Sequence, residues 1–194
     1  MGTPTRNVVA AVQISLDGYM QGPAGEVDWV ESWNEALGLV PEAEVAVIGG
    51  GTFPGYEQLW GAIAADPDSG AGMLGRPATD GEIEYARWTQ RTPHYVLSAT
   101  LDKSSWASAR LVRSIGELGS LLAQPGGTVY VIGGPALVSS MINEGLISEL
   151  RMIVHPVVLG GGKAPLAGLK ERRSLWLTQA REDASGRAVL TYRV

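Results

Sequence analysis

The stretch VYVIGGPALVSSMI, residues 129–142, joins a short apolar run to an expected helix through two glycines and a proline. The run is rich in β-branched side chains and carries no charge, which is typical of a strand buried on both faces. After the turn at Gly133 and Gly134 we expect a helix over residues 136–144, which Gly145 ends. The glycine pair either meets a steric requirement of the turn or lets a ligand approach the backbone.

The same alternation of strand and helix signals runs along the rest of the chain. It predicts an α/β fold with a mixed, mostly parallel sheet and helices on both faces, in a single domain over residues 1–194. Residues 174–194 read as two strands and predict an antiparallel hairpin at the C-terminal end. We expect further strands at residues 8–14, 45–48, 94–98, 109–112 and 149–162, and helices at 27–39, 52–60, 82–90 and 115–123. Residues 61–81, rich in Ala, Gly, Asp and Pro, are expected to form a loop and a candidate lid.

Composition excludes several classes of protein. The 194 residues are 45% hydrophobic with a net charge of −5, and no basic run marks a nucleic-acid partner. No apolar run approaches the roughly 20 residues that span a membrane, so we expect no membrane association. The chain has no cysteine and two histidines, which excludes thiolate and histidine-rich metal sites and fits the cytoplasm. We expect His94 and His155, both in apolar strands, to be structural.

Small or hydroxyl residues follow three of the expected strands. They lie at residues 49–52 (GGGT), 98–100 (SAT) and 133–136 (GGPA). Ligands of open α/β sheets bind at the carboxyl ends of strands, and a helix N-terminus attracts anions. Three such ends favour a phosphate site, although purely steric glycines remain the alternative, and none matches the G-x-G-x-x-G pattern.

The first loop, SLDGYMQGPAGE at residues 15–26, is the second candidate region. Asp17-Gly18 is a good turn pair, so Asp17 is either a turn former or a catalytic carboxylate beside a pocket. Ser15 lies just past the first expected strand and is a candidate substrate contact.

Acidic and aromatic side chains follow this loop. Asp28, Glu31 and Glu35 are either solvated surface charges or, if buried, proton donors. Of these we select Asp28, together with Asp17, as the catalytic candidates. Trp29 and Trp33 are candidate walls of a substrate pocket.

Four segments together resemble the dihydrofolate-reductase-like superfamily. The similarity is greatest to the reductase domain at the C-terminus of the bifunctional riboflavin-biosynthesis deaminase/reductase and its stand-alone relatives. It covers nearly the whole chain and is most specific in the last segment. The segments are QISLDGYMQGPAGEVDW, VIGGGTF, PHYVLSATL and VYVIGGPALVSSMINEGLISELRMIVHPVVLGGGK.

This resemblance implies NADPH as cofactor and a homodimer as assembly. It implies a cis peptide between Gly133 and Gly134, with the following helix aimed at the cofactor pyrophosphate. It places the adenosine half and its 2′-phosphate at residues 97–100, and Ser15, Asp17 and Trp29 on the substrate side. The cofactor residues implied are Gly49, Gly51, Thr52, Leu97, Ser98, Ala99, Thr100, Ile132, Gly133, Gly134, Pro135, Ala136 and Leu137.

Two positions depart from the family pattern. Gly50 stands where the family usually has an arginine, which removes one charge-assisted phosphate contact, about 1.5–3 kcal/mol. True dihydrofolate reductases carry a carboxylate on the first helix, and the corresponding position in this chain falls near Asn34. The preference for NADPH over NADH is therefore open. Candidates to replace the missing charge are Arg76, Arg87, Arg91, Lys103 and Arg110.

The function predicted is an NADPH-dependent reductase that delivers hydride to a C=N or C=O carbon of a small heterocyclic or sugar-derived substrate. One alternative is a non-catalytic nucleotide- or metabolite-binding protein on the same scaffold. The other is a reductase that uses a flavin or deazaflavin.

Overall fold

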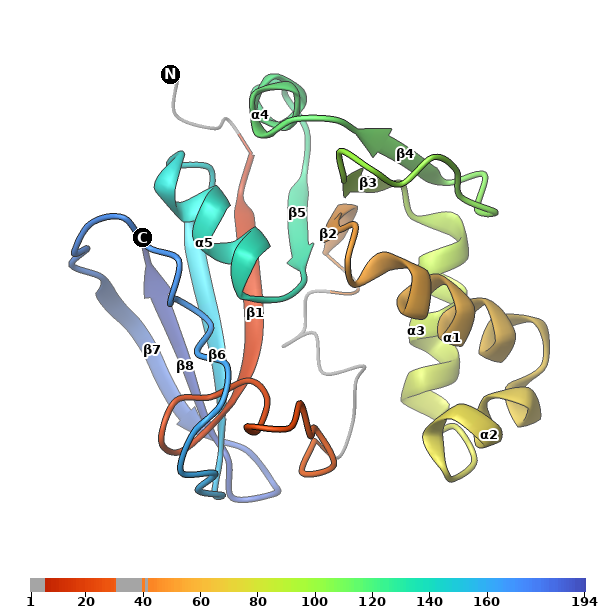
Figure 1. Ribbon diagram of the computed structural model, residues 1–194, viewed down its shortest axis with the longest axis horizontal. Helices are drawn as coiled ribbons and strands as arrows, with labels where there is room; N and C mark the ends of the chain where they lie inside the picture. Colours follow the sequence, from red (N-terminus) through yellow and green to blue (C-terminus); the bar gives the residue numbers. More distant parts are fainter. Residues whose placement is uncertain (1–5, 31–39, 41) are drawn as a thin grey trace.

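Eight strands form one mixed sheet (Figure 1), and the computed structural model describes residues 6–30, 40 and 42–194. The order across the sheet is β4-β3-β2-β5-β1-β6-β8-β7. The strands are β1 Val8–Ser15, β2 Ala43–Gly49, β3 His94–Leu97, β4 Ala109–Val112, β5 Thr128–Ile132, β6 Glu149–His155, β7 Trp176–Glu182 and β8 Ala188–Arg193.

The direction of the strands confirms the predicted sheet. The pairs from β4 to β6 are parallel, whereas β8 pairs antiparallel with both β6 and β7. Parallel strands need a crossover, which contains helices between β2 and β3, β4 and β5, and β5 and β6 but none between β3 and β4, while β7 and β8 are joined directly as a hairpin. The sheet is thus mostly parallel, with the antiparallel hairpin at one edge.

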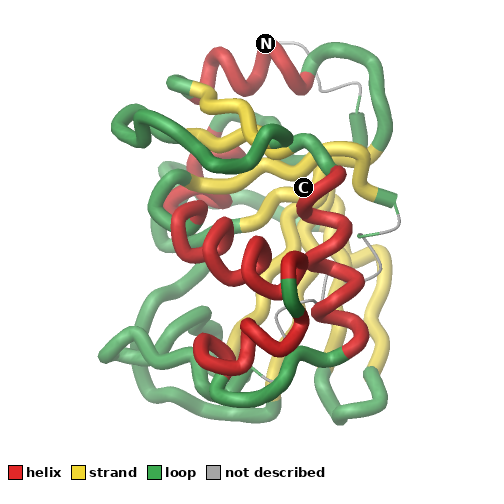
Figure 2. Tube along the Cα trace, turned by 90° about the vertical axis from the view of Figure 1, so that its right-hand side faces the viewer, coloured by secondary structure: helices red, strands yellow, loops and turns green. Residues whose placement is uncertain are grey.

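Helices cover both faces of the sheet, also as predicted. On β1 the even-numbered side chains such as Val8 and Val12 pack under α4 and α5, and Val9 lies in the other cluster, under α1 and α3. Figure 2 views the molecule from the side of α1 and α3, so these helices lie in front of the yellow strands. The helices are α1 Phe53–Ala65, η1 Pro67–Gly70, α2 Ala71–Leu74, α3 Asp80–Arg91, α4 Ile115–Leu122 and α5 Pro135–Asn143.

Two predicted elements need correction. Residues 61–81, expected to be a loop and lid, are largely helical: α1 continues to Ala65, and η1, α2 and the first turn of α3 follow. The continuation of α1 has a physical reason, because alanines favour a helix and Ile63 is fully buried. The helix expected at 27–39 does not begin at Val27, since residues 27–30 form a turn, and residues 31–39 lie outside the described residues.

An aromatic cluster fills the space between α1, α3 and the sheet. The Tyr56 hydroxyl lies 3.0 Å from that of Tyr85 and 3.3 Å from Nε2 of His94. His94 Nδ1 lies 2.7 Å from the carbonyl oxygen of Thr92. Burial lowers the pKa of His94 to about 4, only partly opposed by the Thr92 carbonyl. His94 is therefore structural, as expected.

The longest helix of the described residues, α1, has 13 residues, and none of these helices is long and apolar enough to cross a lipid bilayer.

Candidate functional site

The carboxyl ends of β3, β2 and β5 meet at one edge of the sheet. Gly49 pairs with Leu97, and Ile48 with Ile132, so the three small-residue segments predicted from the sequence lie side by side. From β2 the chain passes into α1 on one face, and from β5 into α5 on the other. This reversal between neighbouring strands is the topological switch point at which open α/β sheets bind ligands. We call this edge, formed by residues 49–52, 97–100 and 133–137, the glycine ledge.

The glycines allow close approach of these three segments. A Cβ atom on Gly133 would lie 3.0 Å from Cδ2 of Leu137 and 3.6 Å from the backbone nitrogen of Gly49. A Cβ atom on Gly50 would lie 2.4 Å from Cβ of Ser98, which no real pair of atoms adopts. Glycine at 50 and 133 therefore has a steric reason, and Leu137, which packs against Gly133 and Gly49, is a buried core residue.

The cis peptide implied for Gly133-Gly134 is not found, because every peptide bond in the described ranges is trans. Gly133 has a φ of 159° and Gly134 a φ of −78°, and this pair of conformations leads the chain from β5 into α5 without a cis bond.

Two helices begin at the glycine ledge without a capping side chain. The N-cap of α1 is Thr52, and no side-chain hydrogen bond of the described residues caps this helix. The N-cap of α5 is Gly134, which has no side chain to offer. By contrast, the side chains of Thr79 and Ser114 cap α3 and α4. Uncapped N–H groups at a helix N-terminus are donors of the kind that bind anions in other proteins.

An arginine, Arg113, lies beside residues 97–100 of the glycine ledge. The Ser98 hydroxyl accepts hydrogen bonds from the backbone N–H groups of Thr100 and Leu101, which shapes a tight turn. Arg113 Nη1 donates to the carbonyl oxygens of Ser98 at 3.2 Å and Leu101 at 2.7 Å. An exposed guanidinium thus lies directly against the predicted adenosine segment.

Arg113 was not among the residues expected to replace the missing arginine. Arg76 instead forms an ion pair with Glu82, and Arg110 lies 3.7 Å from Glu117. Arg87 and Arg91 lie on α3, where they line an open hollow that includes no residue of the ledge. The signal that identifies Arg113 is the pairing of β3 with β4, because Arg113 directly follows β4.

The first loop is fastened to the chain after β6 through Asp17. Its carboxylate accepts hydrogen bonds from the Ser15 hydroxyl at 2.7 Å and from the backbone N–H groups of Leu159 and Gly160. The hydrogen bonds from Ser15, Leu159 and Gly160 lower the pKa of Asp17 despite the opposing effect of desolvation. These contacts hold the first loop against the chain after β6, and the catalytic role of Asp17 stays a prediction.

Ser15 shares this structural role. Its side chain is fully buried, and its hydroxyl also accepts a hydrogen bond from the backbone N–H of Tyr19. Its hydrogen bonds are directed into its own loop, and the contact of Ser15 with substrate stays a prediction.

A second concave region lies past this loop. An open pocket of about 730 Å³ separates residues 25–30 from the segment around α2, and Asp28, Val30, Met73 and Arg76 are among its lining residues. We call it the loop pocket. Its walls combine carboxylates, apolar side chains and a guanidinium already paired with Glu82.

Trp29 lies against the end of β6, and the described lining of the loop pocket does not include it. Its ring meets that of His155 edge-on, with the centroids 5.0 Å apart, and His155 Nε2 lies 2.8 Å from Oε1 of Gln13. The buried indole nitrogen of Trp29 has no hydrogen-bond acceptor among the described residues, which is uncommon for a buried donor. Trp33, the other predicted wall, lies outside the described residues, as do Glu31 and Glu35.

Comparison with known proteins confirms the resemblance seen in the sequence. A family model described as the RibD C-terminal domain matches residues 6–189. A relative from Bacillus subtilis (strain 168), the uncharacterized protein YyaP, is 28% identical over 193 residues, which cover 96% of this chain and 94% of the relative.

Solved structures agree on the fold. A Shewanella sp. PV-4 protein named for riboflavin biosynthesis has a TM-score of 0.70 at 21% identity, covering 97% of this chain and 99% of its own. A pyrimidine reductase-like protein from Corynebacterium diphtheriae has a TM-score of 0.60 at 14% identity, covering 97% and 91%. The dihydrofolate reductase from Enterococcus faecalis, complexed with NADP(H), has a TM-score of 0.58 at 14% identity, covering 100% and 98%. These likenesses establish a dihydrofolate-reductase-like fold.

Proposed function

Because the chain belongs to the RibD C-terminal domain family, we propose that it is a reductase that takes NADPH as its hydride donor. Its substrate is a small heterocyclic or sugar-derived molecule that carries a C=N or C=O bond. The names of two similar structures, a pyrimidine reductase-like protein and a dihydrofolate reductase complexed with NADP(H), support this choice.

The observation that carries the proposal is the pair of uncapped helix N-termini at the switch point of the sheet. A pyrophosphate is a divalent anion, and the free N–H groups of α1 and α5 offer it hydrogen bonds together with the positive ends of two helix dipoles. A Cβ atom at Gly51 or Gly134 would meet no described atom within 4 Å, so space remains for phosphate oxygens next to both. The residues present therefore fit the cofactor.

The adenosine half of the cofactor is assigned to residues 97–100. There the Arg113 guanidinium supplies the positive charge that Gly50 does not, and a 2′-phosphate is the group that distinguishes NADPH from NADH. An arginine at position 50 would also meet Ser98, so the two positions are coupled. We assign NADPH preference to Arg113.

The substrate is assigned to the loop pocket, which opens beyond the end of β1, the strand next to β5. When bound, the nicotinamide supplies a hydride. The chain's own contribution is to hold the substrate against Val27 and Val30 and to place Asp28 at the wall of the pocket as the candidate for proton delivery. Asp17 fixes the loop that carries these residues.

A non-catalytic nucleotide-binding protein is the second candidate, favoured by the loss of the family arginine at Gly50 and by the engagement of Asp17. A reductase binds NADPH and turns it over, whereas the alternative binds a nucleotide or metabolite without turnover. We expect the purified protein to consume NADPH, followed by the loss of nicotinamide absorbance, with at least one member of a panel of pyrimidines, pterins and cyclic imines.

Further measurements separate the remaining alternatives. Binding without turnover across the panel supports the non-catalytic candidate. Flavin absorbance of the purified protein, with no NADPH binding, supports a flavin- or deazaflavin-dependent reductase. Loss of turnover in Asp28→Asn, with NADPH affinity and melting temperature unchanged, supports Asp28 as the proton source, and full activity of this variant would assign the proton to solvent.

A further inference from the structure

The charged residues in the described lining of the loop pocket are two carboxylates and one arginine. Glu26 and Asp28 belong to the wall formed by residues 25–30, and Arg76 belongs to the wall on the side of α2 (Figure 1). The charge that a bound substrate meets therefore depends on what Arg76 is bound to. The uncharged members of the described lining are Gly25, Val27, Val30, Met73 and Leu74.

Arg76 is neutralised by a buried carboxylate. Its Nη1 and Nη2 atoms donate to the two carboxylate oxygens of Glu82 at 2.8 and 2.9 Å, and Nη1 also donates to the carbonyl oxygen of Pro77. The Glu82 side chain is fully buried, and the backbone N–H and the hydroxyl of Thr79 donate to it as well. Burial raises the pKa of Glu82, but the hydrogen bonds from Arg76 and Thr79 outweigh this effect and hold the pKa below its usual value. Glu82 is therefore ionised at neutral pH, and the pair adds no net charge to the pocket.

The part of the sequence that contains the first wall supplies no cation. Residues 7–75 contain ten Asp and Glu residues and no Lys, Arg or His, although the whole chain has 15 Lys and Arg. Residues 31–39 and 41, which lie outside the described part of the chain, belong to this stretch and bring no positive charge to the pocket. The negative charge of the pocket therefore does not depend on where these residues lie.

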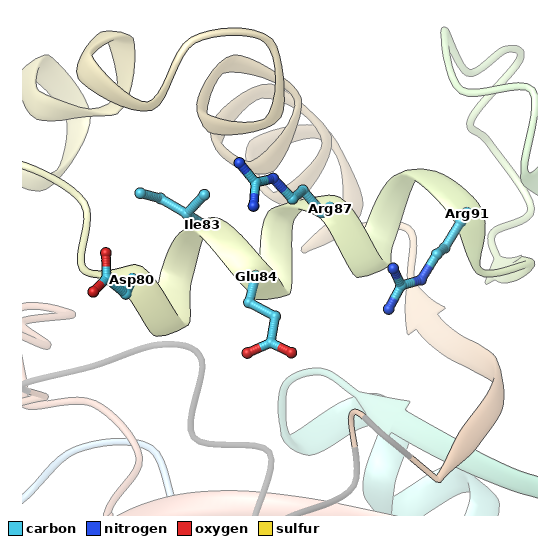
Figure 3. A pocket seen from close by; sticks show the side chains of 5 residues that line it. All are labelled: Asp80, Ile83, Glu84, Arg87 and Arg91. Atoms are coloured by element: carbon cyan, nitrogen blue, oxygen red, sulfur yellow. The ribbon is translucent and has the colours of Figure 1, made fainter.

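Other cations of the chain belong to different surroundings. Arg87 and Arg91 line a separate hollow on α3 together with two carboxylates (Figure 3). The backbone of Lys163 pairs with that of Gln21 in the first loop, but Lys163 is not among the described lining residues of the loop pocket. Two carboxylates with no balancing cation thus remain in the described lining.

Unbalanced carboxylates in a concave site select ligands by charge. A cleft lined by one sign of charge concentrates ligands of the opposite sign, and like charges placed side by side are repelled. A protonated amine, imine or amidine also gains charge-assisted hydrogen bonds from a carboxylate, while its apolar part can cover Val27 and Val30. A phosphate or carboxylate on the ligand gains neither, because the guanidinium of Arg76 is already engaged in two hydrogen bonds to Glu82.

We propose that the loop pocket selects a substrate that carries a positive charge and rejects one that carries a phosphate or a carboxylate. Glu26 and Asp28 are the residues that determine this specificity. The proposal rests on the assignment of the substrate to this pocket in the function proposed above. Of the two acceptor groups named there, it favours C=N, because the nitrogen of this group can be protonated before the hydride reaches the carbon.

Aryl probes of matched shape test the charge selection without cofactor or turnover. Benzamidine is a cation, benzamide is its neutral analogue, and benzoate and phenyl phosphate are anions. Binding to the whole protein is followed by the amide NMR shifts of residues 25–30 and 73–76, which report on the two walls of the loop pocket. We expect benzamidine to bind there at least tenfold more tightly than benzamide. Benzoate and phenyl phosphate should give no saturable shift of these amides.

Two sets of variants test the residues that carry the selection. Glu26→Gln with Asp28→Asn should abolish the preference for benzamidine, whereas Glu42→Gln, an exposed carboxylate that precedes β2, should keep it. Glu82→Gln removes the charge that neutralises Arg76 and should raise the affinity for phenyl phosphate about tenfold. Glutamine also serves in a capping box, so the start of α3 is preserved in this variant.

Several results would overturn the proposal. They are benzoate or phenyl phosphate binding the loop pocket as tightly as benzamidine, benzamidine gaining no affinity over benzamide or shifting only other amides, and the double variant keeping the preference. Each of these leaves the proposed reductase intact, because binding and consumption of NADPH are measured separately. Conversely, a protein that neither binds nor consumes NADPH but binds benzamidine as expected refutes the reductase and keeps the charge selection of the pocket.

Discussion

Replacing Gly134 by alanine separates the steric role of the glycine ledge from its role in binding. Gly134 has a φ of −78°, which any residue adopts, and an added Cβ meets no atom within 4 Å in the described part of the chain. The folded state therefore accommodates the new methyl group without strain. The substitution also restricts the unfolded chain, which raises the free energy of unfolding by about 0.4–1 kcal/mol. In a domain of this size we expect a melting temperature about 1–4 °C higher.

Cofactor binding should respond in the opposite direction. The new methyl group lies at the N-terminus of α5, in the space assigned to the pyrophosphate. If it displaces one charge-assisted hydrogen bond, about 1.5–3 kcal/mol of binding free energy is lost. Affinity for NADPH then falls by about 10- to 150-fold.

The assay pairs a thermal melt with an NADPH titration for each protein. Gly116→Ala is the matched control, because Gly116 lies in α4 and its Cβ also meets no described atom within 4 Å. We expect the control to keep wild-type affinity. If Gly134→Ala binds NADPH as tightly as the wild type does, the pyrophosphate does not lie on α5 and the assignment of the ledge is refuted.

Three further predictions concern single side chains. Arg113→Ala should weaken NADPH binding about tenfold and leave NADH binding unchanged. The control, Arg110→Ala, should change the affinity for neither cofactor. An equal loss of affinity for both cofactors in Arg113→Ala would contradict the 2′-phosphate assignment. Asp17→Asn should lower the melting temperature but keep turnover, and loss of turnover in a well-folded variant would restore Asp17 as a catalytic residue. Burial lowers the pKa of His94 to about 4 in the folded protein. As the pH falls from 6.5 to 4, His94 is therefore protonated in the unfolded chain before it is protonated in the folded one. The free energy of unfolding should fall by about 3 kcal/mol over this range. Urea denaturation across this range should show the decline in the wild type and not in His94→Gln, and an identical decline in both would contradict it.

The strands and the small-residue segments of the glycine ledge could be predicted because each is marked by a short stretch of adjacent residues. Short β-branched runs that end in glycine predicted β2 and β5, and the expected bounds of β4 agree with the structure. The position of the ledge then follows from topology, since parallel strands bring their carboxyl ends to one edge. The loop predicted for residues 61–81 was wrong. Alanine favours helices, whereas glycine, aspartate and proline favour loops, and composition alone does not show which preference prevails.

The roles of Asp17 and Arg113 depend on contacts that no local pattern records. The N–H groups that hold Asp17 come from Leu159 and Gly160, more than 140 residues along the chain. The local sequence therefore predicted either a turn former or a catalytic carboxylate at Asp17 and did not reveal these partners. Arg113 is adjacent to Ser98 only because β4 pairs with β3. The resemblance indicates that an arginine is missing at Gly50, and we propose from the fold that Arg113 takes its place.

A direct titration of the purified protein with NADPH and NADH, followed by tryptophan fluorescence, tests the central claim. The chain has six tryptophans, whose emission is quenched by energy transfer to a reduced nicotinamide bound nearby. We predict saturable quenching by both cofactors, with NADPH bound at least tenfold more tightly than NADH. If neither cofactor binds with a dissociation constant below about 1 mM, the chain is not a nicotinamide-dependent reductase.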